Sequence, residues 1–507
     1  MLNFTKHKTK RRNKMKKLLA FLLVAVMSFA MLVSCGGNGD GDGDDNGEGG
    51  GQSTPPTAES VLAAAQAALE NSAYKTSVSL GLESNNAEMN EQFQEYTAMD
   101  ITLTVKGDDF SMETKIESEG VSASRSVSLI NKTIYVVQSY GDQVSGRKCV
   151  LNDAQLVAAN DKLKKDFAGD FALADFNSVV LSDVDGKQVI TCTGIKDEAI
   201  DKINDLIDSI VGGAPVGASF NDVSIIYTVA NGKFEKTAVS FGFTFEVEGE
   251  SIDVDMSVDS AYDYSATELN APANADTFED IDYEDVVGRT SYNEYAEAPN
   301  GTYVVVETFV QGKQAWWFDS EDNTGKGTIY TQSYDGGYFL YEVPLTEEEY
   351  NALEVGTHIM VYGFKAEWDG EIEIIDAEIK ILDNYTWVAF PQDATALLGT
   401  AEIEDLRDSK VYFGNMTVVA SNDAGDAFLY KWNGSGNVGD DIYFKASVNG
   451  KTYTFVIESY LTPDGSEAYE AAQALKVGDV INMEAFLYWY GTSAQPHVYS
   501  ITVVEAE

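Results

Sequence analysis

Histidine and cysteine are both scarce in this sequence, with three residues of each among 507. Zinc sites and histidine-assisted catalysis depend on these two residue types. His358 and His497 lie 139 positions apart, and neither has a cysteine beside it. The chain also lacks a Walker loop and the GxSxG and HExxH motifs. We therefore expect no catalytic residue, no metal ligand and no cofactor.

Basic residues are few, because 34 Lys and Arg stand against 82 Asp and Glu, a formal net charge of −48. Residues 1–35 hold eight of the basic residues and no acid, so the remaining 472 residues carry 26 − 82 = −56. A surface of this charge repels the phosphate backbone of DNA and RNA. We expect no nucleic acid partner.

Long apolar runs are also missing, apart from one that begins at Leu18 and ends at Val33. It follows the basic residues Lys16 and Lys17 and is short for a membrane-spanning helix. A basic segment, an apolar segment and small residues at a cleavage site together indicate a secretory signal. Met15 is an alternative start, since Met15–Cys35 alone is a complete signal.

The sequence Leu32-Val33-Ser34-Cys35-Gly36 at the end of this run resembles the lipobox of bacterial lipoproteins. The resemblance implies that residues 1–35 are a signal peptide and that Cys35 is the lipid attachment site, carrying acyl chains such as palmitate. Acyl chains would anchor the protein to the cell membrane and leave the chain on the extracellular face. Residues 36–56 are rich in Gly and Asp, and we expect them to form a disordered linker.

Residues 57–266 combine helical segments with strands in which apolar and polar residues alternate. Thr57 is a suitable N-cap for a helix, and further helices are predicted near 152–167 and over 196–211. The last part predicts three strands joined by tight turns, at residues 223–229, 239–247 and 252–258. One apolar and one polar face are typical of an antiparallel sheet that covers an apolar interior.

This order of elements resembles the lipoprotein-carrier superfamily that includes LolA and LppX, most plainly in segments 221–224, 231–233 and 262–265. The resemblance implies a half-open barrel with helices on its concave side and an apolar cavity that can hold acyl chains. A core filled entirely by side chains is the alternative. Cys149 and Cys192 fall in this region and could either form a disulfide or remain separate buried thiols.

After an acidic linker expected at residues 267–289, a pattern occurs twice, which predicts two domains at 290–384 and 396–505. Leu353-Glu354-Val355-Gly356-Thr357 matches Leu475-Lys476-Val477-Gly478-Asp479. A short acidic helix precedes each copy, and an apolar strand follows it.

The repeat resembles the OB-fold, a small Greek-key barrel with one short helix between its third and fourth strands. The fold class expected for the whole chain is therefore mainly β and multidomain. An antiparallel half-open β-barrel with helices is followed by two small OB-like Greek-key β-barrels.

All six tryptophans lie beyond residue 300. Trp316 and Trp317 are adjacent and cannot both face a core from one strand, and the same holds for the run 488–490. Exposed rings can stack on sugars or anchor a protein, although they can also cover an interface between barrels. The candidate ligand contacts are Trp316, Trp317, Trp368, Trp432, Tyr488, Trp489 and Tyr490.

Our leading hypothesis is a lipid-anchored extracellular binding protein without enzymatic activity, which engages a glycan, a lipid or an envelope protein. The first alternative is a lipid or lipoprotein carrier or chaperone that uses an apolar cavity in residues 57–266. The second is a hydrolase with paired carboxylates, which rests only on the abundance of acids.

Overall fold

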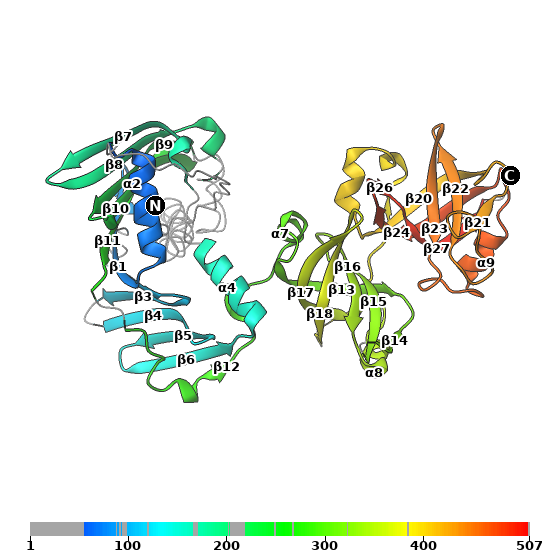
Figure 1. Cartoon of the computed structure of the whole chain (residues 1–507), viewed down its shortest axis with the longest axis horizontal. Helices are drawn as coiled ribbons and strands as arrows, with labels where there is room; N and C mark the ends of the chain where they lie inside the picture. The colour runs from blue at the N-terminus through cyan, green and yellow to red at the C-terminus, as the bar shows by residue number, and fades with distance from the viewer. Residues whose placement is uncertain are drawn as a thin grey trace, which may run out of the picture. The chain divides into compact units, whose positions relative to one another are not determined.

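The computed structural model describes residues 55–87, 89–90, 93, 99–118, 121–165, 171–200, 202, 219–247, 250–265, 268–321, 323–382 and 385–504. They form two compact units, of which the first ends at Val287 and the second begins at Gly288 (Figure 1). Cys35, the signal around it, linker residues 36–54 and most of the helix predicted over 196–211 lie outside these residues. Within the described ranges, no helix has both the length and the apolar character that a membrane crossing requires.

The first unit is an open sheet that contains twelve strands among the described residues, and almost all of its neighbouring strands are antiparallel. The strands are β1 (Tyr74–Ser84), β2 (Asp100–Lys106), β3 (Asp109–Ser118), β4 (Val121–Ile130), β5 (Thr133–Tyr140), β6 (Gln143–Val150), β7 (Phe176–Val184), β8 (Lys187–Ile195), β9 (Ser219–Ala230), β10 (Lys233–Val247), β11 (Glu250–Asp263) and β12 (Glu279–Asp280). Helices of this unit that lie within the described residues include α2 (Ala58–Glu70), α4 (Asp153–Lys165) and α6 (Glu284–Val287). Across the sheet the order is β12-β6-β5-β4-β3-β2-β1-β11-β10-β9-β8-β7.

Helix α2 lies on the inner side of this curved sheet (Figure 1). It begins at the predicted N-cap, where the Thr57 hydroxyl accepts from the Ser60 backbone N–H and the Ser60 hydroxyl accepts from that of Thr57. The apolar side of the helix packs against β10 and its neighbours through Val61, Leu62, Ala65 and Leu69. Each fully buried Leu or Val contributes about 1.5–3 kcal/mol. The predicted antiparallel, half-open sheet with helices is therefore confirmed.

Cys149 on β6 and Cys192 on β8 are separate, buried thiols. In the described sheet eight strands lie between β6 and β8. A disulfide requires Cα atoms within about 7 Å, and neighbouring strands alone are about 4.8 Å apart. The disulfide considered from the sequence is therefore wrong, and the alternative of isolated thiols holds. Burial raises the pKa of each thiol to about 11.

Part of the segment predicted as an acidic linker, residues 267–289, instead belongs to the first unit. Strand β12 pairs with β6 in parallel. The buried ring of Phe278 lies against Gly146, where a Cβ atom would come within 2.2 Å of it. Tyr283 and Val287 are buried as well. The prediction followed the acidic composition and missed these apolar anchors, which bind the segment to the sheet.

The second unit contains, within the described part of the chain, two closed barrels of five strands each. The first barrel consists of β13 (Tyr303–Lys313), β15 (Thr324–Gln332), β16 (Gly337–Pro344), β17 (His358–Trp368) and β18 (Glu371–Ile381), with β14 (Trp317–Asp319), α7 (Tyr292–Glu297) and α8 (Glu347–Ala352). The second consists of β20 (Lys410–Val419), β22 (Ile442–Val448), β23 (Lys451–Ile457), β24 (Val480–Phe486) and β27 (His497–Val503), with β19 (Gln392–Asp393), β21 (Phe428–Tyr430), β25 (Trp489–Tyr490), β26 (Ser493–Ala494) and α9 (Glu467–Gln473).

Both barrels close in the same order. The first strand of each pairs with the second and the fourth, and the third pairs in parallel with the fifth. Helices α8 and α9 occupy the predicted place between the third and fourth strands. This is the arrangement of an OB-like Greek-key barrel, so the prediction of two such barrels is confirmed.

The repeated sequence motif has a structural reason in both barrels. Leu353 and Leu475 are buried in the two barrel cores. Gly356 and Gly478 follow with φ angles of 92° and 101°, a backbone conformation that favours glycine. The motif therefore anchors the chain in the core and turns it into the fourth strand.

The thiol assignment predicts how the protein reacts with alkylating reagents. For the chain from residue 52, which retains every described residue, we expect both cysteines to resist iodoacetamide in the folded state. Both should react after unfolding without any reducing agent, because the thiols are buried and unpaired. Intact-protein mass spectrometry counts the added groups. A disulfide would show itself as alkylation that requires prior reduction.

Candidate functional site

The two barrels of the second unit pack against each other through aromatic side chains. Tyr330 of β15 stacks on Phe486 of β24 with ring centroids 4.4 Å apart, and Phe339 of β16 meets Tyr488 at 5.4 Å. In an OB-fold, the face of the second and third strands is the surface that binds oligonucleotides or oligosaccharides. Strands β15 and β16 are those strands in the first barrel, so the second barrel covers part of that face.

Hydrogen bonds from both backbone and side-chain groups also join the two barrels. The backbone N–H of Lys410 donates to the Gln332 side chain at 2.9 Å, and that of Ala315 donates to the carbonyl of Tyr460 at 2.8 Å. The Arg407 guanidinium donates to the carbonyl of Gly370 at 3.1 Å. The barrels are therefore joined in one defined register.

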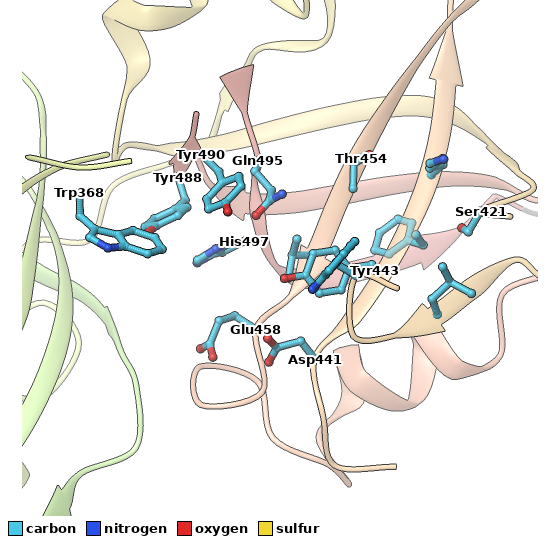
Figure 2. A pocket seen from close by; sticks show the side chains of 15 residues that line it. Trp368, Ser421, Asp441, Tyr443, Thr454, Glu458, Tyr488, Tyr490, Gln495 and His497 are labelled. Atoms are coloured by element: carbon cyan, nitrogen blue, oxygen red, sulfur yellow. The ribbon is translucent and has the colours of Figure 1, made fainter. Parts of the chain in front are cut away.

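The corresponding face of the second barrel is open and forms a cleft of about 650 Å³, within the usual range of about 300–1,000 Å³ for ligand sites. Strands β22 and β23, the loop after β20 and the loop after β24 line it. Figure 2 shows side chains from these segments around the cleft, with Trp368 of the first barrel at one end.

Three exposed rings form much of this surface. Trp432 is 75% exposed, Trp368 is 55% exposed and Tyr490 is 46% exposed. The rings of Trp368 and Tyr490 lie 5.9 Å apart and are tilted by 51°. Together they offer flat apolar faces to the solvent at a site that also carries polar groups.

The position of Trp368 depends on two glycine turns. Gly491 donates its backbone N–H to the Asp369 carbonyl at 2.6 Å. Gly370 has a φ of 89°, and a Cβ atom there would lie 2.0 Å from the carbonyl oxygen of Gly491. Only glycine fits this contact, which holds the β17–β18 hairpin, and with it Trp368, beside the β25–β26 turn.

Of the seven aromatic residues predicted as ligand contacts, four line the cleft: Trp368, Trp432, Tyr488 and Tyr490. The other three lie elsewhere. Trp316 donates its indole N–H to the Leu345 carbonyl at 2.9 Å, and Trp317 lies 5.2 Å from the ammonium of Lys326. Trp489 is buried in the core of the second barrel and faces Arg407.

Sequence reasoning missed the polar residues of the cleft. Asp441, Tyr443, Glu458, Gln495 and His497 line it together with the rings. No local motif marks them, because barrel closure brings them together from three separate segments. His497 was considered from the sequence only as a metal ligand, and among the described residues no cluster of metal-ligating side chains occurs.

Two carboxyl groups in the cleft differ in their surroundings. Asp441 accepts hydrogen bonds from the backbone N–H and the hydroxyl of Ser459 at 2.9 and 2.7 Å. Burial, reinforced by the neighbouring charge of Asp441, raises the pKa of Glu458 to about 7 even though Glu458 accepts two backbone N–H bonds. Near neutral pH the cleft therefore contains one carboxyl group that can hold or release a proton.

A second acid pair lies buried where the barrels meet. The carboxyl groups of Glu371 and Asp408 face each other, and Glu371 also accepts from the Trp489 backbone N–H at 2.5 Å. No other group among the described residues donates a hydrogen bond to their remaining three oxygens. Burial raises the pKa of Glu371 well above its usual value and that of Asp408 to about 7, so the pair shares a proton.

The first unit has a cavity of its own, of about 860 Å³, against strands β3 to β6. Its lining mixes apolar side chains such as Ile116 and Val144 with Arg125 and several Ser and Gln residues. An acyl chain is best matched by a lining that is apolar throughout. The cavity is therefore a weaker match to a defined ligand than the cleft of the second barrel.

Comparisons with known proteins do not assign this chain to a family. No family model matches this chain, and no curated protein matches it. A murine DNA-binding protein bound to double-stranded DNA is similar in structure, with 9% identity, a TM-score of 0.22, and coverage of 40% of this chain and 96% of that one. The HINb domain of p204 shows 8% identity, a TM-score of 0.22, and coverage of 41% and 100%.

A replication protein A heterotrimer bound to single-stranded DNA shows 9% identity, a TM-score of 0.17, and coverage of 65% of this chain and 91% of that one. The similarity to HIN and OB-fold DNA-binding domains is thus distant. At these scores it contributes nothing to the assignment of a function.

The shared proton of Glu371 and Asp408 predicts a pH dependence of stability. Because their folded pKa values exceed the unfolded ones of about 4, their stabilising contribution is complete below about pH 4 and declines as the pH rises to about 7. His497 opposes this, since burial lowers its pKa to about 3 and its contribution grows between about pH 3 and 6.5. An Asp408→Asn variant should lose less stability than the wild type between pH 5 and 7.5, by about 2 kcal/mol.

Urea unfolding followed by tryptophan fluorescence measures this difference, because all six tryptophans lie in the second unit. Asp405→Asn removes the same charge from an exposed position of the same segment and serves as the control. An equal pH dependence in the wild type and in Asp408→Asn would contradict the shared proton.

Proposed function

We propose that this chain is a lipid-anchored binding protein of the bacterial cell surface, without enzymatic activity, that holds a glycan in the cleft of its second barrel. The observation that carries the proposal is the cleft itself, where the exposed rings of Trp368, Trp432 and Tyr490 surround a set of polar side chains. It occupies the face that OB-folds use for oligosaccharides and oligonucleotides.

The chemistry of the cleft favours a sugar over the other ligands of this fold. Aromatic faces pack against the C–H faces of sugar rings, while hydroxyl groups need polar partners such as Gln495, Thr454 and Asp441. The chain carries a net charge of −48, and the cleft is lined by two acids, Asp441 and Glu458, and one base, Lys445. A phosphate backbone would meet repulsion there, whereas a neutral glycan would not.

The anchor is part of the same proposal. The lipobox ending at Cys35 supports acylation of that thiol, and residues 36–56 provide a Gly- and Asp-rich tether. Fully extended, a tether of this length reaches ~70 Å. The first unit is then a separate folded body on the same anchor. Because it resembles lipoprotein carriers, we propose that its role is accessory to glycan binding.

A second candidate function is glycoside hydrolysis, which one specific observation favours. Asp441 and Glu458 are neighbouring carboxyl groups on one wall of the aromatic cleft (Figure 2), and burial raises the pKa of Glu458 to about 7. Glycosidases use two carboxyl groups with unlike surroundings in this way. Shorter oligosaccharides after incubation with the protein, lost in Glu458→Gln, would support this candidate over simple binding.

The cleft predicts which substitutions weaken glycan binding. A glycan array identifies the ligand of the chain from residue 52, and calorimetry measures its affinity. Trp432→Ala and Trp368→Ala should each weaken binding about tenfold, or about 1.4 kcal/mol, because each removes a large exposed ring from the cleft. Trp317→Ala is the matched control, because that ring is also exposed but does not line the cleft. Absence of any binding on the glycan array, or an equal loss of affinity in all three variants, would count against the proposal.

The anchor predicts where the protein is found. Full-length protein expressed in a bacterial host with labelled palmitate should carry the label and sediment with membranes. Cys35→Ser should lose both properties, because it removes the proposed acylation site. Cys149→Ala, which alters a buried thiol in the sheet, should keep the label. Label on the Cys35→Ser variant would refute acylation at this position.

A further inference from the structure

His497 is one of the buried polar residues that line the cleft. It begins β27, the residue is 7% exposed, and its ring stacks on Tyr488 with ring centroids 4.1 Å apart. The stacking fixes the plane of the imidazole at the wall of the cleft (Figure 2). Burial lowers the pKa of His497 to about 3, so the ring is neutral at physiological pH.

One nitrogen of this ring bonds across to the first barrel. The Nδ1 atom lies 2.7 Å from the hydroxyl oxygen of Tyr330, whose side chain is fully buried. The same hydroxyl accepts a hydrogen bond from the Gln314 amide nitrogen at 3.1 Å. Gln314, Tyr330 and His497 therefore form a chain of two hydrogen bonds that crosses the contact between the barrels.

The direction of this chain follows from the donors that each group possesses. The Tyr330 hydroxyl accepts from Gln314 and has one proton of its own to donate, and Nδ1 of His497 at 2.7 Å is the acceptor that the described residues place beside it. A buried hydroxyl proton without an acceptor would be unfavourable. Nδ1 is then the acceptor, and a neutral imidazole in this state carries its single proton on Nε2.

The Nε2 atom has no hydrogen-bond partner among the described residues, although the ring lines the cleft. A ligand oxygen in the cleft could accept from it. The carboxyl groups of Asp441 and Glu458 line the cleft against the one ammonium group of Lys445, so an uncharged oxygen is a better match than an anionic one.

We propose that Gln314 and Tyr330 of the first barrel fix His497 of the second barrel as an Nε2–H donor, which binds an uncharged oxygen of the glycan, a hydroxyl or an amide carbonyl. Gln314 and Tyr330 are positioning residues, and His497 is the ligand contact. This inference rests on the proposed function of the cleft. It also makes recognition depend on the docking of the two barrels, because neither barrel contains the whole chain of hydrogen bonds.

Imidazole ¹⁵N NMR tests the assignment without any ligand. The chain from residue 52 contains only His358 and His497, and a His497→Asn variant assigns the signals. In the wild type we expect the His497 proton on Nε2, with no change between pH 8 and pH 5. A proton on Nδ1, or a mixture of the two forms, would overturn the assignment.

A Gln314→Glu variant reverses the direction of the chain. An ionised carboxylate only accepts, so Tyr330 would donate to it and accept from Nδ1–H of His497, which leaves Nε2 without a proton. The NMR signals should show this exchange, and glycan affinity should fall about three- to tenfold for one lost hydrogen bond. Exchange of the proton with unchanged affinity would overturn the role of His497 in binding.

Tyr330→Phe provides a second test if the charge that Gln314→Glu places at this half-buried position disturbs folding. It removes the hydroxyl and should give a mixture of imidazole forms with a similar loss of affinity. Tyr295→Phe is the matched control, because Tyr295 is fully buried in the first barrel and its hydroxyl has no partner among the described residues. Failure to bind any glycan would contradict the proposed function of the cleft. The NMR measurement on the protein without ligand tests the hydrogen-bond chain independently of that function.

Discussion

The aromatic contact between the two barrels is the interaction on which the rest of the second unit depends. Tyr330 stacks on Phe486 and Phe339 meets Tyr488, so apolar faces that would be exposed in separate barrels are buried against each other. The contact covers part of the face of the second and third strands in the first barrel, whereas the corresponding face of the second barrel lines the cleft. The repeated domain thereby becomes an asymmetric pair, in which the described part of the second barrel carries the cleft.

The same contact also brings polar groups into a dry environment. The Glu371 and Asp408 pair, and the hydrogen bond between Tyr330 and His497, lie at or beside the joined surfaces. Groups in such surroundings stay neutral or share protons, because water no longer stabilises their charged forms. The cleft consequently combines aromatic faces, the neutral imidazole of His497 and one acid of raised pKa, Glu458, with the side chains of Asp441 and Lys445, in a chain whose overall charge is strongly negative.

Prediction from sequence succeeded where a pattern is local. Alternating residues located β9, β10 and β11, and the repeated Leu-x-Val-Gly segments located the entry into β17 and β24. Prediction from sequence failed where a contact joins residues that lie far apart in the sequence. Phe278 packs on Gly146 across 132 positions of sequence, so the acidic residues around Phe278 suggested a linker instead of a strand. Cys149 and Cys192 likewise could not be kept apart without the order of the strands.

The amino-acid sequence by itself determined the class of fold, the two barrels and the fact that some neighbouring aromatic rings must be exposed. These properties follow from side-chain periodicity and turn chemistry, which act over a few residues. Only the tertiary structure decided that Trp368 and Tyr490 share a cleft, while Trp489 is in a core. It also joined Tyr330 to His497, which are 167 positions apart, because barrel closure and docking, and not any local pattern, set which distant side chains meet.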